Sequence, residues 1–182
     1  AAPCYFRSNQ GTIARLATSV GQIGVGYSGK IVVIDDSGNV WRFTETGDGW
    51  TQVAAGTFAS HMTNISLLFC DSRGYLFFGA AVTSHSDLYR STDDGATWAS
   101  VKSFPLTTDS AAPMCEDDAG NLYLGSYGSL SAGSNSCKLY KSTDGGANWT
   151  DISANMPSTP ARHIHGTWWD NYRKLLFVTH GD

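Results

Sequence analysis

An eight-residue pattern that occurs twice limits the fold of this chain more than any other feature. The pattern reads S-x-D-x-G-x-x-W at residues 91–98 and 142–149, and the two tryptophans are 51 positions apart. A weaker copy at residues 44–50 keeps an acidic residue, a glycine and a tryptophan. A period near fifty residues, with glycine turns and several short strands in each period, is typical of a β-propeller.

A second shared unit precedes each strong copy of the pattern. Residues 71–79 and 118–125 both begin with an aspartate, turn at a glycine and continue into an apolar strand with aromatic residues. Together the two units predict blades of four antiparallel strands. The strands expected in the first three blades are 22–27, 30–35, 40–44 and 50–54; 65–70, 75–79, 88–91 and 98–101; and 112–115, 122–125, 138–142 and 149–152.

The repeated pattern has a physical purpose that requires no ligand. In a tight hairpin, serine and aspartate side chains hydrogen-bond backbone amides, and glycine adopts backbone conformations that other residues resist. The tryptophan then packs its indole beneath the turn. We therefore expect structural roles for Ser91, Asp93, Gly95, Trp98, Ser142, Asp144, Gly146 and Trp149.

The octet resembles the Asp-box, also called the BNR repeat. This motif occurs in sialidases, in some β-propeller glycoside hydrolases, and in non-enzymatic propellers such as sorting receptors and photosystem assembly factors. With two full copies and one degenerate copy at blade spacing, the resemblance extends across nearly the whole chain. It implies a β-propeller whose boxes lie on the outer edge, away from any active centre.

The two ends of the chain together predict a fourth blade. Residues 164–169 and 174–179 have the pattern of its first two strands, and residues 5–11 align with the box hairpin at 88–94. We therefore expect a single all-β domain over residues 1–182, a propeller of about four blades whose last blade is shared between the N- and C-termini. Such closure would leave few unpaired edges and a monomeric chain. The alternative is a fragment of a larger propeller, completed by a second copy or by a longer chain.

Composition excludes several classes of function. Twelve basic against sixteen acidic residues give a net charge of −4, which does not favour nucleic-acid binding, and no apolar run is long enough to span a membrane. The sequence contains no nucleotide or other cofactor motif, so no cofactor is expected. Four cysteines (three pairings), two sequons at Asn64 and Asn148, and a start at Ala1 that fits signal-peptide removal favour an extracellular protein.

The histidines suggest where a ligand would bind. Strand polarity places all five on or near the face formed by the loops between blades and between second and third strands, which in most propellers carries the central pocket. His163 and His165 should point the same way, because side chains alternate along a strand. This pair alone lacks the spacing of a metal site, so no metal is expected. The candidate ligand-binding residues are Arg162, His163, His165, Trp168, Tyr127, His61, His85 and His180.

These residues favour recognition of a glycan or glycoconjugate, because aromatic rings stack on sugar rings and polar side chains bind hydroxyls. The alternatives are a glycoside hydrolase or other glycan-processing propeller, and a non-enzymatic protein-interaction scaffold. Hydrolysis generally needs two carboxyl groups, and the expected face offers only Asp87, Asp109 and Asp182. Sialidase resemblance would imply three arginines gripping a carboxylate, whereas only Arg162 lies on that face. Classical sialidase activity is therefore not expected, and whether the chain is an enzyme is left open.

Overall fold

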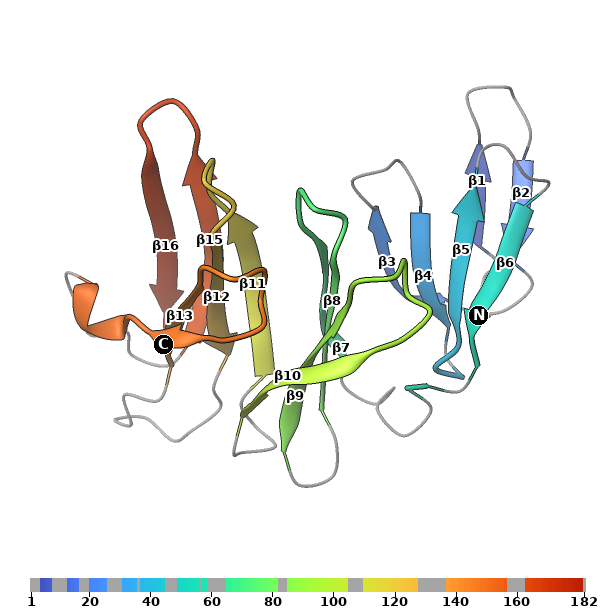
Figure 1. The fold of residues 1–182 in the computed structure, drawn as a ribbon, viewed down its shortest axis with the longest axis horizontal. Coiled ribbons are helices and arrows are strands. Elements are labelled where there is room, and N and C mark those ends of the chain that lie inside the picture. Colours follow the sequence, from blue (N-terminus) through green and yellow to red (C-terminus); the bar gives the residue numbers. More distant parts are fainter. Residues whose placement is uncertain are drawn as a thin grey trace.

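A computed structural model gives the fold as short antiparallel strands that follow one another along the chain (Figure 1). The structure describes residues 4–7, 13–16, 20–25, 31–35, 37–44, 49–55, 57–58, 65–81, 85–104, 110–127, 137–156 and 163–181. Within these residues the one helical element is a 3-10 turn at Ser153–Asn155, and no helix there is long and apolar enough to cross a membrane. The protein is therefore built almost entirely of β-structure.

The strands form sheets in the order of the sequence. A two-stranded hairpin comes first, two four-stranded sheets follow, and the strands after residue 110 form a six-stranded sheet. The strands are β1 (Cys4–Arg7) and β2 (Ile13–Leu16); β3 (Val20–Val25), β4 (Ile31–Asp35), β5 (Val40–Thr44) and β6 (Gly49–Ala54); β7 (Ile65–Cys70), β8 (Leu76–Ala81), β9 (Ser86–Ser91) and β10 (Ala99–Phe104); β11 (Ser110–Glu116), β12 (Leu122–Tyr127), β13 (Leu139–Ser142) and β14 (Thr150–Asp151); and β15 (His163–Asp170) and β16 (Leu175–Gly181).

The sheets stand side by side as blades do (Figure 1). Strand β3 lies beside β7, β7 beside β11, and β11 beside β15, so the first strands of consecutive sheets are neighbours. The six-stranded sheet consists of a four-stranded unit, β11–β14, and the hairpin β15–β16, joined where Tyr127 at the end of β12 pairs with His163 at the start of β15. We call β3–β6, β7–β10 and β11–β14 the first, second and third sheets, and β15–β16 the last hairpin.

Apolar side chains fill the spaces between consecutive sheets. One buried cluster, with Ile34 and Phe78, lies between the first and second sheets, and another, with Phe77 and Leu124, between the second and third. A smaller cluster around Ile164 joins the third sheet to the last hairpin. The second and third sheets are thus apolar on both faces, which explains why their inner strands are rich in consecutive hydrophobic residues.

The expected strands are found with small shifts at their ends. The largest shift is in β10, the fourth strand of the second sheet, which ends at Phe104 and not at residue 101. The fourth strand of the third sheet is only two residues long, because the chain turns into the 3-10 element. There the Asp151 carboxylate accepts hydrogen bonds from the backbone amide and the hydroxyl of Ser153, at 2.9 and 2.5 Å. In the second and third sheets an aspartate turn joins the first strand to the second. In the first sheet the aspartate turn joins the second strand, β4, to the third strand, β5.

The chain ends do not form a shared blade. Hairpin β1–β2 is a sheet of its own among the described strands, and it lies beside β5 and β6, at the opposite end of the row from β15 and β16 (Figure 1). Only residues 17–19 connect this hairpin to β3, so it stays close to the first sheet. The prediction of a last blade completed within one chain is therefore wrong for this structure, in which the described strands form an open row.

Candidate functional site

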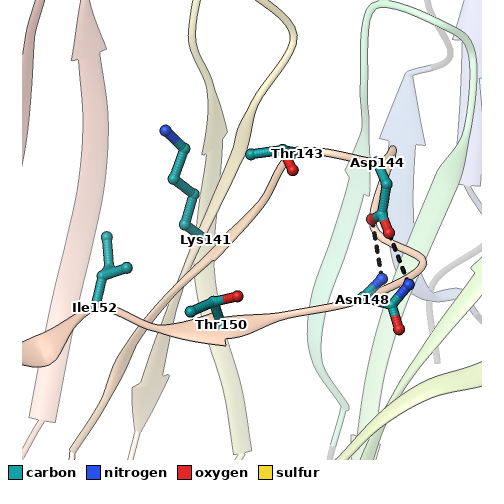
Figure 2. Close-up of a pocket in the computed structure, with 6 residues that line it drawn as sticks. All are labelled: Lys141, Thr143, Asp144, Asn148, Thr150 and Ile152. Carbon is teal, nitrogen blue, oxygen red and sulfur yellow. Dashed lines mark hydrogen bonds between the residues drawn. The ribbon is translucent and has the colours of Figure 1, made fainter.

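The two copies of the octet fold into closely similar hydrogen-bonded turns. In the second copy, the Ser142 hydroxyl accepts a bond from the Gly146 amide (2.8 Å) and donates to Asp144 (2.8 Å). The Asp144 carboxylate accepts from the backbone amide and the side chain of Asn148, at 2.9 and 2.7 Å (Figure 2). The indole of Trp149 donates to the carbonyl of Gly146. All of these partners lie within eight residues, so the octet specifies its own shape.

The first copy repeats these contacts with one exchange. Ser91 accepts from the Gly95 amide at 2.9 Å and donates to Asp93 at 2.8 Å, and Trp98 donates to the Gly95 carbonyl. Threonine takes the place of asparagine, because the Asp93 carboxylate accepts from the amide and hydroxyl of Thr97. The eight residues for which the sequence predicts structural roles all take part in these contacts.

A second kind of turn uses an aspartate after the preceding strand. Asp35, Asp71, Asp117 and Asp170 each accept hydrogen bonds from backbone amides two to four residues later. In the third sheet the carboxylate that does this belongs to Asp117, one position before the Asp118 with which the sequence unit was expected to begin.

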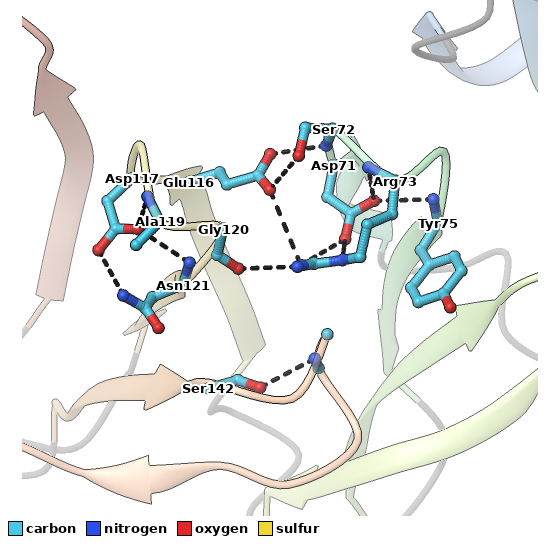
Figure 3. A network of polar contacts seen from close by, with 12 residues as sticks. Asp71, Ser72, Arg73, Tyr75, Glu116, Asp117, Ala119, Gly120, Asn121 and Ser142 are labelled. Atoms are coloured by element: carbon cyan, nitrogen blue, oxygen red, sulfur yellow. Dashed lines mark hydrogen bonds and ion pairs between the residues drawn. The ribbon is translucent and has the colours of Figure 1, made fainter.

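These turns also connect the second sheet to the third (Figure 3). The Arg73 guanidinium is bonded to Asp71 and reaches across to the carbonyl of Gly120, at 3.0 Å. Glu116 accepts from both the amide and the hydroxyl of Ser72, at 2.6 Å each. We call the side of the molecule formed by the octet turns and the aspartate turns the turn end.

A shallow hollow of about 240 Å³ lies beside the second octet turn (Figure 2). Its lining residues are Lys141, Thr143, Asp144, Asn148, Thr150 and Ile152. The side-chain amide of Asn148, the acceptor of a sequon, is bonded to Asp144. Asp144 and Asn148 thus serve the turn itself.

The opposite side, which we call the loop end, includes the end of β12, the starts of β9 and β15, and the end of β16. Here the rings of Tyr127 and His163 are stacked, with centroids 4.1 Å apart and planes 8° apart. His165 stands edge-on to both, at 6.0 Å from Tyr127 and 5.5 Å from His163. We call these three residues the ring cluster. They come together because β12 and β15 pair there and because alternation places His163 and His165 on the same side.

The ring cluster is open to solvent on one side and incompletely satisfied on the other. Tyr127 is 41% exposed, and His165 is exposed as well. The Nδ1 atom of His163 is buried without a hydrogen-bond partner. His165 Nε2 lies so close to Gly181 that a Cβ there would be 2.9 Å away, and His180 precedes that glycine on the strand paired with β15. An aromatic surface with several ring nitrogens nearby can accept a flat, hydroxyl-rich ligand.

A separate polar group lies at the loop end of the second sheet. His85 directly precedes β9, in which Asp87 and Tyr89 lie two residues apart. The Asp87 Oδ2 atom meets His85 Nε2 at 3.2 Å and the Tyr89 hydroxyl at 3.1 Å. Burial and the Asp87 charge raise the pKa of Tyr89 to about 12. Asp87 is itself buried, and its Oδ1 atom has no hydrogen-bond partner. The sequence named His85 and Asp87 separately; their common face on one strand could have linked them.

The indole of Trp168 lies over Gly166, which directly follows His165 of the ring cluster in β15. Trp168 pairs with Phe177 across the last hairpin and is 54% exposed. Trp169 faces the other way, where it stacks on Tyr123 of the third sheet with planes 4° apart and donates to Asp118. Arg162, His61, Asp109 and Asp182 lie outside the described residues. No cluster of three or more metal-binding side chains occurs among the residues that are described.

Comparison with known proteins identifies the class of fold. No protein-family profile matches the chain. A xyloglucanase from Paenibacillus sp is 28% identical over 161 residues, which are 72% of this chain but 14% of that protein. An ancestral GH74 enzyme superposes with a TM-score of 0.60 at 15% identity, covering 98% of this chain and 23% of the other. Virginiamycin B lyase from Staphylococcus aureus superposes with a TM-score of 0.59 at 16% identity, covering 98% and 56%.

The structural neighbours are β-propellers, and this chain has the same class of fold. It spans about one seventh of the xyloglucanase and little more than half of the lyase.

Proposed function

We propose that this chain is part of a glycan-binding β-propeller and that the ligand binds at the ring cluster. The observation that carries the proposal is the half-exposed stack of Tyr127 on His163, with His165 edge-on beside it. A phenol face supplies apolar contact to a sugar ring, and the hydroxyl and imidazole nitrogens supply hydrogen bonds to its hydroxyls. The similarity to a xyloglucanase supports a glycan as the ligand.

The proposal also includes two more specific predictions from the sequence, namely membership of the Asp-box propellers and export from the cell. The octet turns have the hydrogen bonding expected of Asp-boxes, which supports membership of that family of propellers. Their position at the turn end agrees with a role in the scaffold and not in the ligand site. Export from the cell is supported by the two sequons and by the cysteine count.

Binding of xyloglucan oligosaccharides, measured by isothermal titration calorimetry, tests the proposal. We expect Tyr127→Ala to weaken binding about tenfold or more, because the stacking surface is lost. The matched control is Tyr172→Ala, since Tyr172 is 92% exposed but lies at the aspartate turn of the last hairpin. Equal affinity of the two variants, with both correctly folded by circular dichroism, would contradict the assignment of the site.

A second candidate is hydrolysis of a glycan, which the buried Asp87 favours. One of its oxygens is held by His85 and Tyr89, while the other has no partner and could receive a hydrogen bond from a ligand. Release of reducing ends from xyloglucan by the wild-type chain, abolished in Asp87→Asn, would support this candidate. Binding without release would leave recognition as the function.

A further inference from the structure

The ring cluster lies where the third sheet meets the last hairpin. Tyr127 ends β12 and His163 begins β15, and the pairing of these two residues is the only one between the two strands in the described part of the chain. The rings stack with centroids 4.1 Å apart, so the stack depends on how closely the strands approach each other. Because one residue pair supplies few backbone hydrogen bonds, side-chain contacts beside it must help to set that distance.

Gly125, two residues before Tyr127, lies directly against Ile164 of β15. Both residues are buried, and a Cβ on Gly125 would lie 2.5 Å from Cγ2 and 2.8 Å from Cβ of Ile164. These distances are shorter than a Cβ can tolerate, so only glycine permits this approach. Ile164 cannot easily move aside, because it packs in the buried cluster with Cys137 and Leu139.

The face of β12 that carries Gly125 meets β15 at three places. Tyr123 stacks on Trp169, Gly125 lies against Ile164, and Tyr127 stacks on His163. These three residues of β12 share one face because side chains alternate along a strand. A methyl group added at the middle position would push β15 away and open the stack that follows it. The absence of a side chain at residue 125 thus bears directly on the geometry of the ring cluster.

The same contact also bears on His165, through a bulge in β15. The register between β15 and β16 shifts between Ile164 and Gly166, and His165 lies within this shift. Bulges re-aim side chains, and here the ring of His165 stands edge-on to Tyr127 and His163, with centroids 6.0 and 5.5 Å away respectively. Ile164 lies between the two histidines in sequence, so its position against Gly125 helps to fix both rings.

We propose that Gly125 is a positioning residue of the ligand site. It acts through Ile164, because the close contact of these two residues brings the three rings of the ring cluster together. The φ of Gly125 lies outside the left-handed region, so an alanine at this position would meet only the crowding of Ile164 and no backbone strain. The inference rests on the proposed function, since it takes the ring cluster as the place where a glycan binds.

Proton NMR of Gly125→Ala tests the inference without a ligand. In the wild type, the nearly parallel ring of Tyr127 should shift the imidazole protons of His163 upfield. These resonances, assigned by their loss in His163→Gln, should move downfield in Gly125→Ala, as they should in Tyr127→Ala. Removal of Cγ2 in the double variant Gly125→Ala, Ile164→Ala should return them toward the wild-type position. Ile164→Leu, which keeps the volume but moves the methyl group next to Gly125, should also shift them downfield and serves where Gly125→Ala does not fold.

The matched control is Gly146→Ala, whose added Cβ collides with the buried Phe77 ring at 2.4 Å, at the turn end and not at the ring cluster. It should leave the His163 resonances and the affinity for xyloglucan oligosaccharides unchanged, whereas Gly125→Ala should weaken binding about tenfold or more. His163 resonances that stay in place in Gly125→Ala, or that move equally in Gly146→Ala, would overturn the inference. A wild type that binds no glycan would instead contradict the proposed function, while the resonances still decide the role of Gly125.

Discussion

The two ends of the sheets differ in how completely they satisfy their polar groups. At the turn end, serine, aspartate and arginine side chains hold backbone groups of their own turn or of the next sheet. Three buried polar atoms at the loop end have no hydrogen-bond partner: Ser86 Oγ, Asp87 Oδ1 and His163 Nδ1. At the turn end this holds for Arg42 Nε, whose guanidinium contacts Asp94 of the first octet turn. A buried polar group without a partner costs about 1–3 kcal/mol of stability.

This difference separates polar groups that stabilise the sheets from polar groups that are able to bind a ligand. Repeated, locally satisfied turns stabilise the sheets and hold them in register, and they do so twice in nearly the same way. The loop end varies from sheet to sheet, and its unsatisfied atoms have the hydrogen-bonding capacity that a ligand can use. Substitutions at the two ends should therefore affect different measurements.

The largest expected effect at the turn end is at Gly146, where the octet turn of the third sheet packs on Phe77 of the second sheet. Gly146→Ala should lower the free energy of unfolding by about 2–5 kcal/mol, because a positive φ of 77° is unfavourable for alanine and the added Cβ would collide with the buried Phe77 ring. The control is Gly74→Ala, at a similar φ of 86° but with no atom within 4 Å of the added Cβ, where only about 1–2 kcal/mol is expected. Chemical denaturation measures both. Equal losses would show that the contact between sheets adds nothing.

A smaller difference should separate two buried serines, one at each end. Ser142→Ala removes a hydroxyl that accepts from the Gly146 amide and donates to Asp144, and should cost about 1–3 kcal/mol. Ser86→Ala removes a buried hydroxyl that has no partner, and should leave the free energy of unfolding unchanged or raise it, because the unsatisfied hydroxyl costs stability. If Ser86→Ala were the more destabilising variant, the distinction between the two ends would be lost.

Whether a contact in this structure could be predicted from the sequence depends on how far apart its residues lie along the chain. The hydrogen bonds of the octet turns are of a kind that the sequence can anticipate, because all their partners lie within eight positions. The sequence predicts the residues of the ring cluster only as candidates at one end, because Tyr127 and His163 are 36 positions apart and strand polarity says nothing about stacking. The shared last blade was predicted wrongly because a match between residues 5–11 and 88–94 identifies a type of hairpin and not its partner. The position of the hairpin β1–β2 beside the first sheet is visible only in the fold.

The smallest expected effect is a dependence of stability on pH that arises at the turn end. Hydrogen bonds from the Asn148 side chain and backbone lower the pKa of Asp144 from its ordinary 3.8 to about 2. Because the folded protein binds this proton more weakly than the unfolded chain, the contribution of Asp144 is complete above pH 4 and is lost as the pH falls toward 2. Midpoints of denaturant unfolding from pH 5 to pH 2.5 should therefore fall less steeply in Asp144→Asn than in the wild type. Asn148→Ala should flatten the dependence in the same direction, since it removes a donor that favours the carboxylate. An unchanged slope in both variants would mean that this carboxylate gains nothing from its turn.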